Sequence, residues 1–183
     1  MIKFLCILLL LVNTVSGQVT EFVNPFIGTS NGGNTFPGAV LPWGMVSVSP
    51  HNHYGSPSGY EFGEDFFYGV GHTHLSGTGC ADLGSIIVTV ATGEIKTLPE
   101  QYRQRYSNEK ASPGYYSVHL DSADVTLECT STLHCGIIKI VSGRDQKINL
   151  LLDAGRSLAI TGGGEAYIIS DTGQQGYNIS GGF

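Results

Sequence analysis

The stretch Val125-Thr126-Leu127-Glu128-Cys129-Thr130-Ser131-Thr132-Leu133 decides the fold class of this chain. Apolar or small side chains stand at its odd-numbered positions and polar ones at its even-numbered positions, apart from the polar Ser131 on the apolar side. Successive side chains of a β-strand point to opposite faces, so this alternation places the odd-numbered side chains together on one face. The stretch therefore predicts a half-buried β-strand.

Short segments of similar character surround this strand. Most of them are separated by turn residues at a spacing of roughly 8–12 residues, which is typical of a β-sandwich or a barrel. Residues 99–106 are polar and are expected to form a helical turn or a loop, and no amphipathic helix of useful length is present. The chain is therefore predicted to be all-β. The further strands are expected at residues 46–48, 86–91, 115–120, 137–141, 148–152, 158–161, 167–170 and 177–180.

The composition excludes several classes of protein. The chain has 183 residues, 41% of them hydrophobic, which is too many for a disordered polypeptide. Its formal net charge is −6 and no cluster of Lys and Arg is present, so nucleic acid is not an expected partner. Only 13% of the residues are charged, while 26 are glycine. Low charge with abundant glycine suits an extracellular all-β protein with many turns.

The N-terminus indicates the compartment. Lys3 precedes the apolar run at residues 4–12, and Val15-Ser16-Gly17 places small residues before Gln18. A run of this length fits a signal peptide and is too short to span a bilayer. We expect a signal peptide at residues 1–17, cleaved after Gly17, and a mature domain at residues 18–183 that is secreted or periplasmic. A buried N-terminal strand is the alternative.

Three cysteines remain in the mature chain, namely Cys80, Cys129 and Cys135. An odd number in an exported chain leaves at least one thiol free or paired with another molecule. A bridge between Cys129 and Cys135 across a tight hairpin is compatible with their spacing, and so are free thiols.

Residues 18 to about 84 are rich in glycine and aromatic residues and are expected to form long loops. Trp43, the only tryptophan, lies in the stretch from Thr35 to Met45. Sugar rings stack their apolar faces on indole rings, so Trp43 is a candidate contact for a carbohydrate. An equally good interpretation places Trp43 as a core residue beneath the sheet.

The histidines allow three interpretations. His72 and His74 are two residues apart, a spacing that projects them to one face of an extended chain. With His51, His53 and Asp82 they offer enough ligands for zinc or iron. They can equally bind a polar ligand, or be held by backbone hydrogen bonds inside a packed loop.

The acidic residues identify no catalytic pair. Glu61, Glu64 and Asp65 are expected to form a solvated face, and Asp153 is expected to form a salt bridge with Arg156. Hydrolysis of a glycosidic bond needs two carboxyl groups flanking that bond, and the spacing of the acids singles out no such pair.

An ordered series of motifs resembles the start of glycoside hydrolase family 92. The resemblance covers most of residues 22–160, and its most specific string is the one that begins at His72. The motifs include Val23-Asn24-Pro25-Phe26-Ile27-Gly28-Thr29, Asn34-Thr35-Phe36-Pro37-Gly38-Ala39, Pro42-Trp43-Gly44-Met45-Val46, His72-Thr73-His74-Leu75-Ser76-Gly77-Thr78-Gly79-Cys80, Asp82-Leu83-Gly84 and Pro113-Gly114-Tyr115-Tyr116-Ser117-Val118.

The resemblance implies a secreted, calcium-dependent, inverting exo-α-mannosidase. It implies that an N-terminal β-sandwich, which this chain contains, pairs with a C-terminal (α/α)6 catalytic domain, which this chain lacks. The general acid, the general base and the calcium ligands are expected in that helical domain, so no catalytic residue and no metal ligand is assigned here. The candidate contacts to a mannose-containing glycan, taken as motif members, are Phe36, Trp43, His72, His74, Ser76, Gly77, Cys80 and Asp82.

The sequence is thus compatible with three functions. The first is the substrate-pocket domain of a secreted α-mannosidase, inactive by itself. The second is a stand-alone carbohydrate-binding module that uses the same loops. The third, less favoured, is a metal-binding domain built on the histidines.

Overall fold

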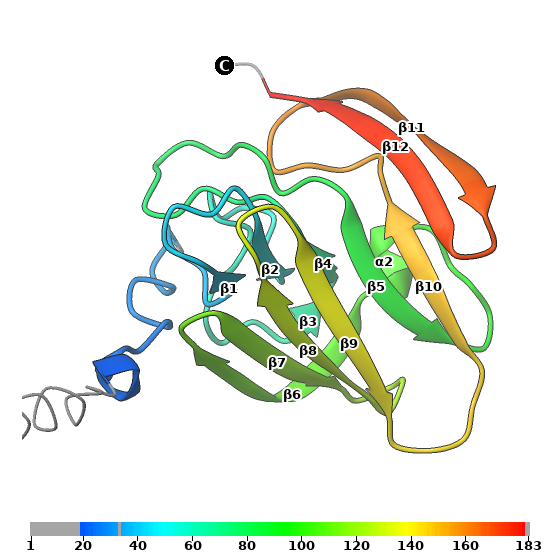
Figure 1. Ribbon diagram of the computed structural model, residues 1–183, viewed down its shortest axis with the longest axis horizontal. Helices are drawn as coiled ribbons and strands as arrows, with labels where there is room; N and C mark the ends of the chain where they lie inside the picture. Colours follow the sequence, from blue (N-terminus) through cyan, green and yellow to red (C-terminus); the bar gives the residue numbers. More distant parts are fainter. Residues whose placement is uncertain (1–18, 33, 182–183) are drawn as a thin grey trace, which may run out of the picture.

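The computed structural model describes residues 19–32 and 34–181. The expected signal peptide and its cleavage site lie outside these residues. Two five-stranded antiparallel sheets pack face to face, and a two-stranded hairpin follows them (Figure 1). The all-β prediction is confirmed, and the architecture is a β-sandwich. Among the described residues, no helix is long and apolar enough to cross a membrane.

The first sheet has the strand order β3-β6-β7-β8-β9, and the second sheet has the order β1-β2-β4-β5-β10. Strands β11 and β12 form the hairpin. A 3-10 helix, η1, opens the described chain, and one short helix, α2, connects β5 with β6. The bounds are η1 Val19–Phe22, β1 Ala39–Val40, β2 Ser47–His51, β3 Phe66–Phe67, β4 Gly69–Gly71, β5 Ile87–Thr92, α2 Pro99–Tyr102, β6 Gln104–Ser112, β7 Tyr115–Leu120, β8 Val125–Ser131, β9 Gly136–Ser142, β10 Ile148–Asp153, β11 Thr161–Ser170 and β12 Gly173–Ser180.

The core lies between the two sheets and is built by the alternation predicted for β8. Val125, Leu127 and Cys129 are buried and pack against residues of the second sheet such as Val48 and Val90. Each fully buried valine or leucine contributes about 1.5–3 kcal/mol to folding. The alternation ends at Ser131, two residues earlier than predicted, because a turn follows in which the Thr132 amide donates to the Cys135 carbonyl at 2.8 Å.

Two further predictions of strands need correction. Residues 99–106 do begin with a short helix, but β6 starts at Gln104 and runs to Ser112, where no strand was predicted. Residues 158–160, predicted as most of a separate strand, are not in a strand, whereas Thr161 and the predicted strand 167–170 belong to the single strand β11, which runs from Thr161 to Ser170 through a bulge at Gly162. The polar residues of β6 and the glycines of β11 hide both strands from a hydrophobic pattern.

The three cysteines among the described residues, Cys80, Cys129 and Cys135, are free thiols, so a Cys129–Cys135 bridge is not formed. Cys129 points into the core, and burial raises the pKa of its thiol to about 12. Cys135 lies exposed in the turn after β8. The expected ion pair is confirmed, because Arg156 Nε lies 3.8 Å from Asp153 Oδ2.

A partly buried carboxyl group on β6 anchors the loop region to the first sheet. Glu109 accepts a hydrogen bond from the Tyr116 hydroxyl at 2.6 Å and another from the Tyr60 hydroxyl at 2.8 Å. Both tyrosines are fully buried, and burial raises the pKa of the Glu109 carboxyl. Tyr60 belongs to the long loop between β2 and β3, so this loop is anchored to β6 and β7 through one side chain.

Replacing this acceptor is expected to destabilise the whole fold. Glu109→Ala leaves two buried hydroxyl groups without a partner, at a cost of about 1–3 kcal/mol for each. Chemical unfolding followed by circular dichroism measures the loss. Glu94→Ala, at an exposed site, is the control and should change the free energy of unfolding by less than about 0.5 kcal/mol. Equal stabilities of the two variants would contradict this account of the loop anchor.

Candidate functional site

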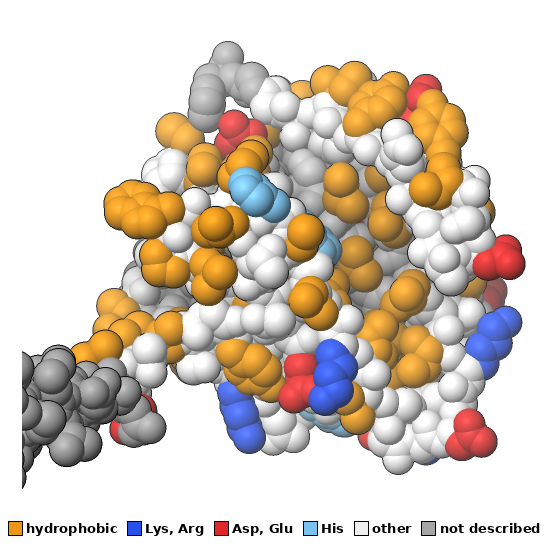
Figure 2. Space-filling view, in the orientation of Figure 1, with side chains coloured by type: hydrophobic (Ala, Val, Ile, Leu, Met, Phe, Trp, Pro, Cys, Tyr) orange, Lys and Arg blue, Asp and Glu red, His pale blue; other side chains and the backbone are white. Residues whose placement is uncertain are grey.

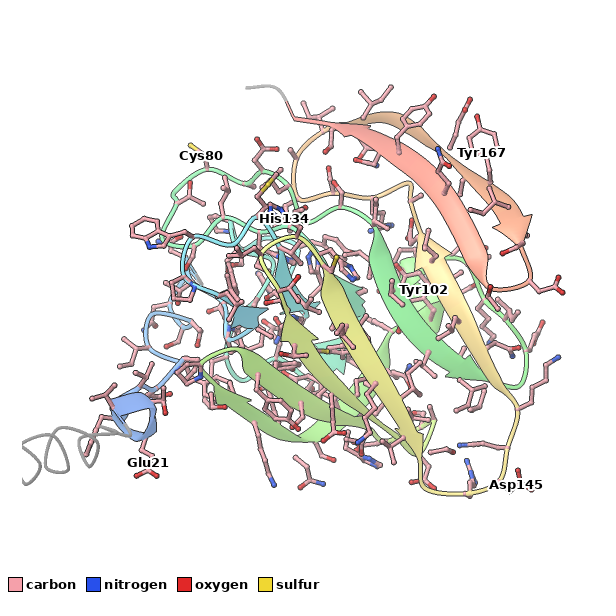
Figure 3. All side chains as sticks on the ribbon, in the orientation of Figure 1. Glu21, Cys80, Tyr102, His134, Asp145 and Tyr167 are labelled. Atoms are coloured by element: carbon pink, nitrogen blue, oxygen red, sulfur yellow. The ribbon has the colours of Figure 1, made fainter. Side chains whose placement is uncertain are left out.

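The loops that carry most of the predicted site residues meet at one end of the sandwich. Figure 3 places Cys80 and His134 at this end and Asp145 at the opposite end. The Ser47 amide donates to the His72 carbonyl at 3.0 Å, and the Gly77 amide donates to the Asn34 carbonyl at 2.5 Å. These bonds join the loop that follows β4 to the segments before and after β1. We call residues 34–46 and 72–85 together the loop end.

Two buried imidazoles lie beneath the loop end. His51 Nε2 and His74 Nε2 are 2.6 Å apart, and His74 Nδ1 lies 3.1 Å from the Ser47 carbonyl oxygen. A carbonyl only accepts, so His74 Nδ1 carries a proton and its Nε2 is the acceptor. His51 Nε2 must then be the donor, which leaves His51 Nδ1 without a proton. That nitrogen has no hydrogen-bond partner. The assignment is inferred from the hydrogen-bond network.

Three glycines make room for this histidine pair. A β-carbon at Gly59 would come within 3.1 Å of the His51 ring, and one at Gly84 within 2.8 Å. A β-carbon at Gly71 would come within 3.0 Å of the His74 ring. Gly59 and Gly84 also have positive φ, which residues with a β-carbon rarely adopt. Much of the glycine in this region is therefore explained by the volume of two imidazole rings.

The electrostatics of the pair follow from its burial. Desolvation lowers the pKa of His74 to about 4, and desolvation together with the neighbouring His74 lowers the pKa of His51 well below its usual value. Both rings are neutral at pH 7. The hydrogen bond from His74 to the Ser47 carbonyl confirms one interpretation of this histidine, namely that a backbone hydrogen bond holds it inside a packed loop.

The structure sorts the predicted residues into three layers. Phe36 and His74 are buried, and their rings lie 5.3 Å apart. His72 and Asp82 are half-buried. His72 packs against Gly136 of β9, where a β-carbon would come within 2.5 Å of its ring, and Asp82 Oδ1 accepts the Leu83 amide at 2.7 Å. Trp43, Ser76, Gly77 and Cys80 form the exposed outer layer.

Trp43 is displayed in an unusual way. Its side chain is 98% exposed, so the interpretation of Trp43 as a core residue is wrong. The Gly44 amide donates to the Leu41 carbonyl at 2.9 Å, which closes a four-residue turn with Pro42 and Trp43 at its centre. Trp43 has a φ of 63°, and this position of such a turn normally takes glycine or asparagine. A strained, fully exposed indole is an observation from which a functional role can be inferred.

Further exposed apolar side chains accompany Trp43, and sequence reasoning did not single them out as site residues. Met45 and Leu133 are linked by a hydrogen bond from the Met45 amide to the Leu133 carbonyl at 2.9 Å, and both side chains are exposed. Leu75 is exposed as well. Figure 2 shows apolar side chains gathered over this part of the surface. Contiguous exposed apolar surface of this kind marks a place where a ligand or another domain binds.

The histidines do not come together as one set of metal ligands in the described part of the chain. His51 faces inward to His74, whereas His53 faces outward, with Nδ1 2.9 Å from Glu64 and Nε2 3.9 Å from Glu61. In the described part of the chain, His53, Glu61 and Glu64 are the only group of three such residues close enough to share a cation. Calcium takes six to eight oxygen ligands. A group with one imidazole and two carboxylates does not fit that requirement.

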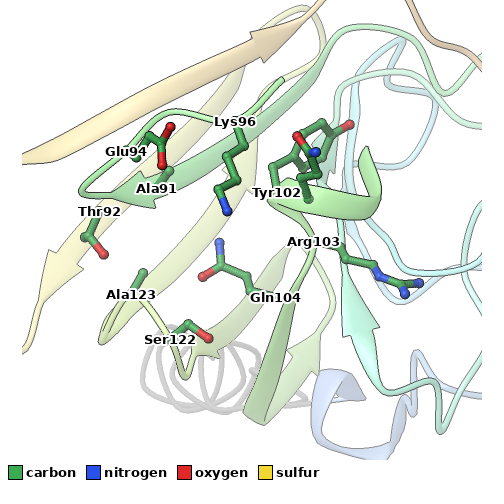
Figure 4. A pocket seen from close by; sticks show the side chains of 10 residues that line it. Ala91, Thr92, Glu94, Lys96, Tyr102, Arg103, Gln104, Ser122 and Ala123 are labelled. Carbon is green, nitrogen blue, oxygen red and sulfur yellow. The ribbon is translucent and has the colours of Figure 1, made fainter. Parts of the chain in front are cut away.

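A polar hollow lies at the other end of the sandwich, away from the predicted residues. It is lined by residues of β5, α2 and β6 and by the turn between β7 and β8. Figure 4 shows the Lys96 side chain pointing toward Gln104 across this hollow. Gln104 Nε2 donates to the Val90 carbonyl at 2.7 Å, so this amide supports the second sheet.

Residues 22–183 match the family model described as "Glycosyl hydrolase family 92 N-terminal domain". A family GH92 α-mannosidase from Bacteroides thetaiotaomicron, solved in complex with mannoimidazole, is 35% identical, with a TM-score of 0.81 over 88% of this chain. A family GH92 inverting mannosidase from Bacteroides thetaiotaomicron VPI-5482 superposes with a TM-score of 0.76 over 91% of this chain. Its identity of 24% supports the fold alone.

A curated relative from Arthroderma benhamiae is described as an uncharacterized secreted glycosidase. It is 31% identical over 134 residues, which are 66% of this chain and 17% of the relative. The chain likewise spans 23% of each of the two mannosidase chains. It therefore represents about a quarter or less of the length of these relatives.

The histidine pair predicts a loss of stability in acid. The unfolded chain takes up protons near the ordinary imidazole pKa of 6.5, whereas His74 resists protonation down to about 4. Stability is therefore complete above pH 6.5 and falls as the pH drops toward 4, by roughly 3 kcal/mol for His74. Chemical unfolding at a series of pH values measures this slope. The double variant His51→Gln, His74→Gln should show a flatter profile, and an unchanged slope would refute the assignment.

The glycine cradle predicts a difference between two alanine substitutions. Gly84→Ala places a β-carbon 2.6 Å from Leu158 Cγ and 2.8 Å from the His51 ring, at a φ of 64°. We expect it to cost about 2–4 kcal/mol through strain and overpacking. Gly93→Ala is the matched control, because φ is 79° there and the space is open, so only about 1–2 kcal/mol of backbone strain is expected. Equal losses in thermal or chemical unfolding would argue against the cradle.

Proposed function

Because this chain belongs to glycosyl hydrolase family 92, with its residues 22–183 in the N-terminal domain, we propose that it supplies part of the mannose pocket of a longer α-mannosidase. The similarity to the α-mannosidase at 35% identity supports the substrate class. One observation carries the role of the chain itself, namely that Trp43 is fully exposed on a strained turn at the loop end.

The proposed role of the loop end is to bind and orient the sugar. An exposed indole offers a flat apolar face to the C–H groups of a mannose ring. Ser76 and the glycines around it add short polar groups and backbone that a ligand can approach closely. The histidine pair and Phe36 hold this surface from below. The pocket is proposed to form where the loop end meets a C-terminal (α/α)6 catalytic domain.

The bond-breaking groups are proposed to come from that helical domain. An inverting glycosidase uses one carboxylic acid to protonate the leaving oxygen and one carboxylate, ~6.5–9.5 Å away, to activate a water molecule. Asp82 is the only acid in the loop from His72 to Gly84. This loop therefore offers Asp82 no partner acid for this chemistry, and the Asp82 carboxylate accepts the Leu83 amide.

Calcium dependence belongs to the same proposal. The one candidate cation group in the described part of the chain does not fit calcium, so the ligands are proposed to lie in the helical domain. There the ion would help to position the sugar and the attacking water. Export through a cleaved signal peptide is also proposed, and the secreted relative from Arthroderma benhamiae supports an extracellular location.

If Trp43 contacts the sugar, replacing it with glycine should weaken substrate binding without lowering the stability of the protein. In the full-length protein, Trp43→Gly removes the strain of a left-handed tryptophan, so the free energy of unfolding should stay level or rise by up to about 1 kcal/mol. Loss of the stacking surface should raise KM for an aryl α-mannoside by roughly 10-fold or more. Ile95→Ala, exposed far from the loop end, is the control and should leave KM unchanged. An unchanged KM for Trp43→Gly would refute the proposed contact.

A second assay distinguishes the enzyme domain from a stand-alone binding module. Titration calorimetry of the chain ending at residue 183 with mannose and α-mannobiose measures whether the loop end binds sugar without a partner. We expect no hydrolysis of an aryl α-mannoside and no binding heat from folded chain. Calcium-independent binding selective for mannose would instead support the carbohydrate-binding module.

A further inference from the structure

The inner face of the second sheet is left uncovered at β10. In the antiparallel pair of β5 and β10, Leu150 lies opposite Val90 and Leu152 lies opposite Val88. Directly opposite side chains point to the same face of a sheet. Val90 is 1% exposed in the core and Val88 packs against the core. Leu150 and Leu152 therefore point to the core side, yet they are 61% and 38% exposed.

The inner face of β10 is uncovered because, among the described residues, the first sheet has no strand beyond β9 to lie opposite it. β9 pairs with β8 alone, so its other edge has no strand beside it among the described residues. On β9, Ile138 and Ile140 reach the core and are only partly buried. A strand added to the free edge of β9 would lie over β10. In Figure 1, β9 and β10 border the open side of the sandwich.

A groove marks this place on the surface. It is lined by Val88, Leu150 and Leu152 from the second sheet and by Ile168 and the turn at residues 170–174 from the hairpin. Its volume is about 690 Å³. Figure 2 shows the hollow with apolar side chains along its floor. The hairpin forms the wall on the side away from β9.

We propose that this groove is the docking site for a β-strand of the same polypeptide that follows residue 183 in the longer protein. The strand pairs with the free edge of β9 along Gly136–Ser142 and places alternate apolar side chains on Leu150 and Leu152. It satisfies the free backbone N–H and C=O groups of β9 and completes the inner layer of the sandwich.

The length of the relatives and the free edge of β9 favour this occupant. The chain spans 23% of the α-mannosidase from Bacteroides thetaiotaomicron, so such a protein has ample further polypeptide to supply a strand. The hairpin borders the groove through Ile168 and residues 170–174. The free edge of β9 offers backbone groups that an added strand can pair. The inference depends on family membership and not on the chemistry of mannose.

Site-specific cross-linking in the natural full-length protein tests the proposal. The photo-cross-linker p-benzoylphenylalanine replaces Leu150, and mass spectrometry identifies the peptide that it captures. We expect an intramolecular link to a segment beyond residue 183 with alternating apolar residues. The control carries the same group at Asp145, exposed in the turn between β9 and β10, and should give no link to that segment.

Three outcomes would overturn the proposal. They are a link confined to residues 19–181, a link to a second copy of the protein, and a natural protein that has no residues after 183. Since none of these readouts involves catalysis, an inactive enzyme would leave this test intact.

Residue-resolved hydrogen exchange on the same protein provides an independent measurement. The β9 amides that do not donate to β8 should exchange at least ~100-fold more slowly than the amides of the turn at residues 143–147, as expected for an interior strand. Exchange of these β9 amides as fast as that of the turn would show that β9 remains an edge and would overturn the proposal.

Discussion

The hydrogen bond between the buried imidazoles of His51 and His74 is the contact on which the loop end depends. It joins β2 to the loop after β4 across 23 residues of sequence, and the Ser47 carbonyl fixes its direction. Two neutral rings avoid the cost of burying a charge, which is several times larger than the cost of burying a paired polar group. Gly59, Gly71 and Gly84 exist at their positions to leave room for these rings. The exposed surface above them is thereby held by a rigid base.

This base explains how long loops can carry a binding surface without regular secondary structure. Loops of this length are either functional or disordered, and these loops are ordered by their own buried side chains. The Glu109 carboxyl holds the loop at Tyr60, and Phe36 closes the histidine pair from the other side. Trp43 is then presented outward on a turn whose strain the surrounding contacts sustain. The buried residues beneath the loop end stabilise it, while the exposed residues of the loop end are the ones proposed to bind the ligand.

The space between the two sheets is filled by the hydrophobic core over most of the sandwich but is left uncovered at β10. Where the two sheets face each other, valine and leucine side chains are buried in a continuous core. At β10 the same inward-facing alternation continues, but no strand covers it. The loop end and the groove at β10 both present apolar surface, and both are surfaces that a longer protein of this family is suited to cover. The chain thus provides a scaffold for a pocket, while the carboxyl pair of glycoside hydrolysis is absent from its loop end.

The sequence by itself determined the all-β class, most of the strands and the family, because alternation and motif spacing are local properties of the chain. The period of two in Val125–Ser131 needs no knowledge of the partner strand, and the motif at His72 is readable as written. Tertiary structure alone decided that His74 pairs with His51 and not with His72, that Trp43 is exposed and not buried, and that β6 is a strand despite its polar residues. Each of these depends on which distant segments meet. The sequence also could not show that the inner face of β10 is uncovered. Leu150 and Leu152 have the pattern of core residues. Their register with β5 places them on the core side, and their exposure shows that no strand covers them.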